Sequence, residues 1–321
     1  MKKTAAFLLA VLLLLAAASA EPVRISISCG GDCTIGCTQE QTGYSSGFKT
    51  AVEKYGYEAF FRNLLPVFGT DDLTLVNLEG PFTDSKDKRQ KKYNFKAPAE
   101  YVEILTAGSV EAVNIANNHS KDYGDRGYLD TMATLDGAGI VYSGNGTTAV
   151  YEVKGVKIGM TGYDIFTNGK KDISADVKAL REAGCAIVIA SFHWGVEYDK
   201  KQNAEQAEVG RAAIDAGADV VIGHHPHVIQ GIECYKGKYI LYSLGNLVFG
   251  GNTDPSDRDT YLARLVFNVE DGKADMAGLQ LIPARLTAKE KNTDYTPVLA
   301  EGKQAEKITQ RILSISKNLP D

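Results

Sequence analysis

The sequence predicts an α/β fold with much parallel sheet, and two observations carry this prediction. Short β-branched apolar runs alternate with segments of helical apolar spacing through the middle of the 321-residue chain, as in folds built from strands and crossover helices. In addition, all five histidines lie at or just past the ends of such runs. Polar residues at these positions are expected because ligands bind outside the carboxyl ends of strands in this class of fold.

The clearest strand end lies in residues 218–230, which read A-D-V-V-I-G-H-H-P-H-V-I-Q. Residues 220–222 have the composition of a buried strand, and Gly223 ends it. Three histidines follow on a tight turn. Burying them would require polar partners, and exposing them would contribute nothing to packing. A functional role is therefore expected for this turn.

The remaining elements are predicted from apolar periodicity. Strands are expected at residues 23–28, 73–76, 110–116, 186–192, 239–241 and 261–269, with a hairpin at 150–153 and 156–160. The strand at 261–269 is expected to be antiparallel. Helices are expected at residues 48–68, 98–107, 127–138, 174–183, 202–216 and 305–319. No internal repeat or interdomain linker is evident.

The N-terminus has the pattern of a targeting segment. Lys2 and Lys3 precede an apolar stretch at 5–17, and Ala-Ser-Ala at 18–20 is a cleavage site of the A-x-A type. We predict a signal peptide at 1–20, with an uncleaved membrane anchor as the alternative. Either interpretation predicts an exported protein that works at the cell envelope or elsewhere outside the cytoplasm.

The five cysteines and the overall charge restrict the interpretation further. Cys29, Cys33 and Cys37 are spaced four residues apart, which suits a local disulfide or buried thiols better than a zinc site. Cys185 and Cys234 are expected to be structural. The net charge of −5 provides no general attraction to nucleic acid.

One segment, residues 85–96, is nevertheless basic and reads S-K-D-K-R-Q-K-K-Y-N-F-K. It is either a solvated surface loop or a contact surface for an acidic substrate or polymer.

The polar residues at the predicted strand ends form a mixed nitrogen and oxygen ligand set. Its members are Asp32, Glu79, Asn118, His119, His193 and the histidines of 224–227. Imidazole and carboxylate together suit zinc, iron or manganese. A carboxylate shared by two ions would create a two-metal site, which lowers the pKa of bound water toward ~7 and assists phosphoryl transfer. A histidine that binds no metal could then protonate the leaving group.

At these residues the sequence resembles the bacterial capsule-synthesis CapA family, which is linked to poly-γ-glutamate. The motifs that carry the resemblance are G-D with Gly36 at 31–36, N-L-E-G at 77–80, A-N-N-H with D-Y-G at 116–124, H-W-G with E-Y at 193–198, G-H-H-P-H with Gln230 at 223–230 and Y-S-L-G-N at 242–246. They are spread over about 23–249. The resemblance implies a calcineurin-like metallophosphoesterase relative whose domain covers 21–285, followed by a C-terminal extension with a helix at 286–321.

Such relatives have two β-sheets sandwiched between helices, a four-layer αββα arrangement. By position, the resemblance implies that one or two divalent transition metal ions (Mn, Fe or Zn) are held by Asp32, Glu79, Asn118, His193, His225 and His227. His119 would be the acid for the leaving group. His224, Asn77, Trp194, Glu197 and Asn246 would contact the substrate.

The sequence departs from the superfamily pattern at two positions. Thr34 stands where a histidine ligand is normal, and Glu79 stands where the bridging residue is normally aspartate. Two interpretations therefore remain. The first is a metal-dependent hydrolase or transferase, acting on a phosphoester or on an envelope polymer. The second is a non-catalytic accessory protein that binds or exports an anionic polymer. Either could work with a membrane-bound capsule synthase complex, and neither involves nucleic acid.

Overall fold

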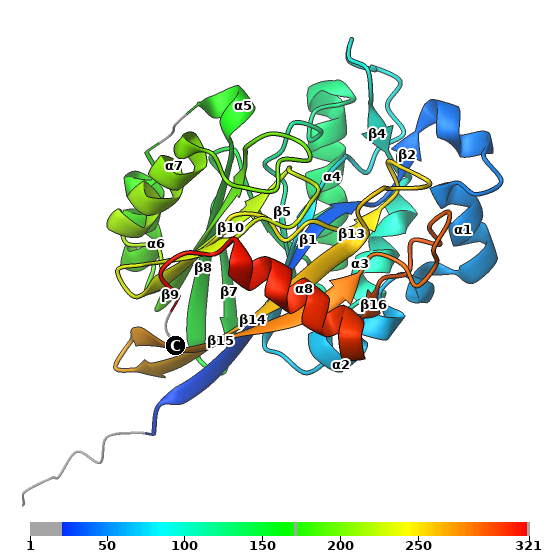
Figure 1. Cartoon of the computed structure of the whole chain (residues 1–321). Coiled ribbons are helices and arrows are strands. Elements are labelled where there is room, and N and C mark those ends of the chain that lie inside the picture. Colours follow the sequence, from blue (N-terminus) through cyan, green and yellow to red (C-terminus); the bar gives the residue numbers. More distant parts are fainter. Residues whose placement is uncertain (1–20, 170–171, 320–321) are drawn as a thin grey trace, which may run out of the picture.

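The computed structural model describes residues 21–169 and 172–319 and contains two β-sheets that pack against each other (Figure 1). The predicted signal segment at 1–20 lies outside the described residues. The first sheet has the strand order β16 (Val298–Leu299), β15 (Lys273–Arg285), β14 (Asp259–Glu270), β1 (Val23–Thr34), β3 (Leu73–Leu78), β5 (Ala112–Asn114) and β6 (Val141–Ser143), and β13 (Asn246–Phe249) also pairs with β1.

The second sheet has the order β11 (Ile232–Tyr235), β12 (Lys238–Leu241), β10 (Val220–His224), β9 (Ile187–His193), β8 (Val156–Asp164) and β7 (Ala149–Val153). A short pair joins β2 (Cys37–Thr38) to β4 (Phe95–Lys96). The central pairs β1–β3, β8–β9 and β9–β10 are parallel, as expected. The late strand β14 runs antiparallel to β1, which confirms the prediction for 261–269.

Helices such as α3 and α4 cover the outer face of the first sheet, and α6 and α7 cover that of the second (Figure 1). The helices are α1 (Phe48–Tyr55), α2 (Leu65–Phe68), α3 (Glu103–Ala107), α4 (Gly124–Ala138), α5 (Ile165–Asn168), α6 (Ser174–Glu182), α7 (Ala204–Asp215) and α8 (Gly302–Ser314). Within the described ranges, none of them is long and apolar enough to span a bilayer.

Strand periodicity divides the core into layers. In β10, Val220 and Ile222 pack into a cluster shared by both sheets, whereas Val221 faces the cluster under α6 and α7. This alternation follows because successive side chains of a strand point to opposite faces. A third cluster joins the first sheet to α1, α3 and α4 through residues such as Phe48, Ile104 and Leu135. The four-layer αββα arrangement is thus confirmed.

Two predicted helices differ in the structure. The helix expected at 48–68 is wrong as a single helix, because α1 ends at Tyr55 and the following Gly56 has a φ of 73°, outside the helical region. Two 3₁₀ turns, η2 (Tyr57–Ala59) and η3 (Arg62–Leu64), then lead into α2. The segment expected as a helix at 98–107 begins as a 3₁₀ turn, η4 (Ala99–Val102), before α3.

Strand β1 is longer than expected because its glycines allow β13 to approach. A Cβ atom on Gly31 would lie 1.9 Å from the carbonyl oxygen of Gly245. The close contact lets the Asp32 amide donate a hydrogen bond to that oxygen at 3.0 Å. The strand predicted at 23–28 therefore continues to Thr34. All five cysteines are free thiols in this structure.

The segment after residue 285 packs on both sheets. Ile308 and Ile312 of α8 are fully buried in the cluster between the sheets. Beyond the helix, the Lys317 amide donates to the Ile232 carbonyl at 2.8 Å, and the Cys234 amide donates to the Lys317 carbonyl at 3.1 Å. The C-terminal helix is therefore part of the same hydrophobic core.

Candidate metal centre

The strand ends of both sheets converge on one group of polar side chains. Asp32 lies near the end of β1, and Glu79 follows β3 directly. Asn118 and His119 come four and five residues after β5, and His193 is the last residue of β9. The register pairs His193 with His224, the last residue of β10. The predicted ligands therefore meet, although they come from two sheets.

Glu79 lies at the centre of this group. Its Oε1 atom is 3.7 Å from Nε2 of His193, 3.8 Å from Nε2 of His227 and 4.0 Å from Nε2 of His119. The side chain is fully buried, and neither carboxylate oxygen accepts a hydrogen bond within the described part of the chain. Burial raises the pKa of Glu79 to about 8. A buried carboxylate without donors is costly, so this geometry suits a bound cation.

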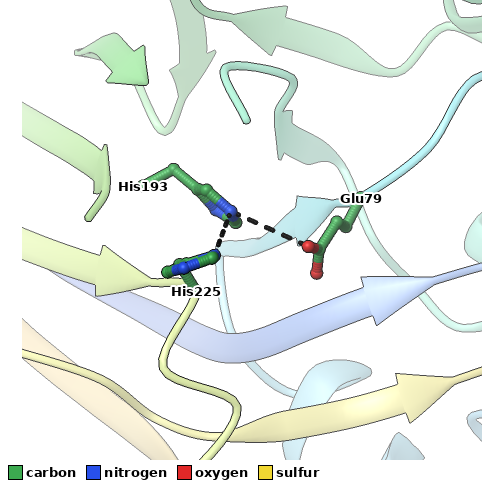
Figure 2. A group of neighbouring side chains, drawn as sticks. All are labelled: Glu79, His193 and His225. Carbon is green, nitrogen blue, oxygen red and sulfur yellow. Dashed lines mark hydrogen bonds and ion pairs between the residues drawn. The ribbon is translucent and has the colours of Figure 1, made fainter. Parts of the chain in front are cut away.

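One set of ligand atoms lies around Nε2 of His193. Figure 2 shows His193 facing both Glu79 and His225, and Nδ1 of His225 lies 3.1 Å from Nε2 of His193. Oδ1 of Asn118 lies 3.2 Å from the same nitrogen. The ligand atoms of Glu79, His193 and His225 all lie within 4.8 Å of one another. Burial lowers the pKa of His193 and lowers that of His225 to about 3. Both imidazoles are therefore neutral near pH 7, which is the form that binds metals.

A second set consists of Asp32, Glu79 and His227. Nδ1 of His227 lies 3.2 Å from Oδ2 of Asp32, and its Nε2 faces Glu79. Burial opposes charge on His227, but the Glu79 and Asp32 carboxylates outweigh it and raise the pKa to about 9. Burial also raises the pKa of Asp32, but the neighbouring imidazoles of His224 and His227 outweigh it and hold that pKa well below the usual value. Thr34, which stands where the superfamily normally has a histidine ligand, is buried. Its Oγ1 has no hydrogen-bond partner among the described residues.

His119 is held by two residues to which the sequence assigns no role. Its Nδ1 atom lies 2.7 Å from Oδ2 of Asp122, and the Lys91 ammonium lies 3.1 Å from the same nitrogen. Lys91 also pairs with Asp122 and donates to the Asn118 carbonyl at 2.9 Å. Asp122 begins the D-Y-G motif and lies three residues after His119. That short spacing could have predicted a contact between the two side chains. Nothing in the sequence places Lys91 here.

The predicted substrate contacts have different surroundings. Asn77 donates to Oδ1 of Asp32 at 2.9 Å, and Oδ1 of Asn246 lies 2.9 Å from Nδ1 of His227. Both therefore orient metal-site side chains. His224 is buried with its Nδ1 3.4 Å from Asp32, and neither ring nitrogen has a hydrogen-bond partner among the described residues. Glu197 is exposed and lies with His225 and His227 in a third possible ligand group.

The structure does not bring Trp194 to the metal centre. Its ring is buried, stacks on Phe192 and packs under the helices of the second sheet. Its Nε1 donates to the Tyr242 carbonyl at 2.9 Å. An aromatic residue does lie at the site, namely Phe166 of α5, whose ring centroid is 4.5 Å from that of His225. Phe166 is 51% exposed, and no sequence signal distinguishes it.

Comparison with known proteins identifies the family and the fold of the chain. A family model described as "Bacterial capsule synthesis protein PGA_cap" matches residues 26–251. The chain is 34% identical over 230 residues to the capsule biosynthesis protein CapA of Bacillus anthracis, covering 63% of this chain and 56% of that protein. It is 36% identical over 221 residues to the PGA biosynthesis protein CapA of Bacillus subtilis, covering 61% and 58%. The matches thus span somewhat more than half the length of these two relatives.

A third relative, from Mycobacterium tuberculosis, is named a probable polyglutamine synthesis accessory protein and is 29% identical over 252 residues, covering 67% of this chain and 66% of that one. Among solved structures, the calcineurin-like phosphoesterase YfkN from Bacillus subtilis superposes with a TM-score of 0.50 at 17% identity, covering 91% of this chain and 98% of that one. This likeness concerns the fold alone. The chain belongs to the bacterial capsule synthesis protein family and has a fold of the calcineurin-like phosphoesterase type.

Proposed function

We propose that this protein is a metal-dependent hydrolase or transferase that acts on an anionic polymer of the poly-γ-glutamate type, or on a phosphoester, in capsule biosynthesis. The observation that carries the proposal is the Glu79 carboxylate, which is buried without hydrogen-bond donors and faces three imidazoles at 3.7–4.0 Å. Such an arrangement is stabilised by a divalent cation, because the cation compensates the buried charge.

We assign one or two divalent transition metal ions (Mn, Fe or Zn) to the two ligand sets described above. Glu79, Asn118, His193 and His225 would hold one ion, and Asp32, Glu79 and His227 would hold a second. When bound, such ions polarise the substrate and activate water near neutral pH. His119 would donate a proton to the leaving group from Nε2, because Asp122 holds its Nδ1. Lys91 would keep the Asp122 carboxylate in place.

A second candidate function is a non-catalytic accessory role in which the site binds or exports an anionic polymer. Thr34 favours it, because a hydroxyl replaces an imidazole beside the second ligand set, which is left with three residues. The mycobacterial relative, which is named a probable accessory protein, agrees with this alternative. Both candidates place the protein outside the cytoplasm with a membrane-bound capsule synthase complex as partner, a placement supported by the targeting pattern at 1–20 and by the names of the relatives.

Metal content is the decisive measurement. Residues 21–321 would be purified without chelator or affinity metal and examined by elemental analysis, together with Glu79→Gln and the exposed control Glu205→Gln. One or two equivalents of a transition metal, lost only in Glu79→Gln, would support a metal enzyme. Turnover would then be tested on bis(p-nitrophenyl) phosphate and on poly-γ-glutamate. No metal after incubation with manganese, iron and zinc would overturn the enzymatic proposal and leave the accessory role.

A further inference from the structure

An open hollow of about 660 Å³ adjoins the metal centre. It is lined by Lys88, Arg89, Gln90, Lys91, Asn118, Lys121, Asp122 and Thr167. Asn118 and Asp122 belong to the metal centre and its supporting residues, so the hollow borders the reacting position. Its lining contains four cationic side chains and a single carboxylate, which makes its potential positive although the chain as a whole is acidic.

Three of the four cations already have carboxylate partners. Lys91 pairs with the buried Asp122, Lys88 lies 2.9 Å from Glu40, and Lys121 lies 2.8 Å from Asp125. The first pair supports the metal centre. The other two ion pairs are exposed to solvent, so each contributes little stabilising energy.

Arg89 is different. Among the described residues, no carboxylate lies within ion-pair distance of its guanidinium group, and the side chain is exposed. Its backbone is nevertheless anchored, because the Arg89 amide donates to the Asp122 carbonyl at 2.9 Å and the Lys91 amide donates to the Arg89 carbonyl at 3.0 Å. An unpaired guanidinium is thus tied to the residue that holds His119. An anion bound there would lie in the hollow that Asn118 and Asp122 also line.

We infer that Arg89 is a specificity-determining residue that binds a second anionic group of the substrate, the carboxylate of the unit next to the reacting one. This inference rests on the proposed function and assigns a subsite to it. Guanidinium is suited to the role because its donors match a carboxylate with two parallel hydrogen bonds. Lys121 strengthens the positive potential of the same hollow.

The subsite selects for a chain with repeated negative groups. A polymer with one carboxylate per unit presents its next charge to Arg89 while the reacting unit lies at the metal centre. A small ester with a single charge leaves the hollow empty. Binding of the chain should weaken as salt concentration rises, because the hollow is open to solvent and its charges are screened.

Binding of penta-γ-glutamate, measured by isothermal titration calorimetry on the protein as purified, tests this assignment. Arg89→Ala should lower the affinity about tenfold or more, since a charge-assisted bidentate contact is lost. Arg89→Lys should recover part of the affinity. The control is Arg62→Ala, which removes an exposed arginine outside the hollow and should bind like the parent. The pentamer with methylated α-carboxyl groups should bind weakly to every variant.

Three results would each overturn the inference. The first is parental affinity for the pentamer in Arg89→Ala. The second is equal binding of the methylated and unmethylated pentamers by the parent. The third is a parent protein that does not bind the pentamer, whether or not it binds polyphosphate. Metal content of the same samples separates this test from that of the proposed function. Binding that depends on Arg89 in a metal-free protein would support the subsite and contradict the enzyme. A protein that contains metal but binds the pentamer equally well with and without Arg89 would support the metal site and contradict the subsite.

Discussion

Nδ1 of His119 lies 2.7 Å from Oδ2 of Asp122, while Nε2 of the same ring faces Glu79 at 4.0 Å. The carboxylate therefore fixes the orientation of the imidazole and stabilises its protonated form, as the aspartate of a catalytic triad does. Burial opposes this effect and lowers the pKa of His119 overall. His119 can therefore act as a general acid only if Asp122 stabilises its protonated form.

Asp122→Asn should accordingly reduce turnover by about 10–100-fold, the usual range for residues that orient a metal-site side chain. Asparagine preserves the shape of the side chain but removes the charge that supports protonated His119. Metal content should stay at the parental level, because Asp122 is not a ligand. Asp125→Asn is the control, since Asp125 is exposed on the same segment. Parental turnover in Asp122→Asn would contradict the role assigned to this carboxylate.

His225 and His119 should separate metal binding from proton transfer. We expect His225→Ala to lose most of the bound metal, because its Nδ1 is one of the atoms that converge near Nε2 of His193. His119→Ala should retain metal but lose turnover, since His119 is assigned to the leaving group and not to the metal. Elemental analysis and rate measurements on the same preparations check both expectations. Normal metal content in His225→Ala would show that the ligand assignment is wrong.

The strand ends are predictable from sequence because buried parallel strands consist of β-branched residues and end in polar ones, as 220–227 do. The pairing of Lys91 with Asp122 is not predictable in this way. It depends on how the loop at 85–96 folds back over the end of β5, and that loop has no periodicity. Trp194 was expected at the site because the resemblance assigns a substrate contact to the H-W-G motif that also contains His193. However, adjacent residues of a strand point to opposite faces, and Trp194, just past the end of β9, packs in the core behind the site.

The metal-free protein should lose stability as pH rises from about 6.5 to 9. The pKa of Glu79 is raised to about 8 and that of His227 to about 9, so the native state holds more protons than the unfolded state in this window. Stability then falls with pH, by on the order of 3 kcal/mol for the coupled pair. The pKa of His225 is lowered to about 3, so its contribution makes stability rise with pH, but only below about pH 6.5.

Urea denaturation of chelator-treated protein at several pH values measures this loss. Added manganese or zinc should reverse it, because metal binding displaces the protons of Glu79 and His227 and becomes tighter as pH rises. The Glu79→Gln variant should show a flatter profile, since one of the two groups no longer titrates. A metal-free protein whose stability rises between pH 6.5 and 9 would contradict the assignment of buried charge at the centre.

Helix α8 should contribute to the stability of the whole domain although it lies after residue 285. Ile308 is fully buried in the cluster between the two sheets, so Ile308→Ala removes a large apolar contact there. The expected cost is about 2–5 kcal/mol in the free energy of unfolding. Leu313→Ala is a matched control on the same helix, because Leu313 is 51% exposed, and it should cost far less. If Ile308→Ala left the urea midpoint of the main transition unchanged, the region 286–321 would be an independent extension, because its packing would then contribute nothing to the fold that holds the metal centre.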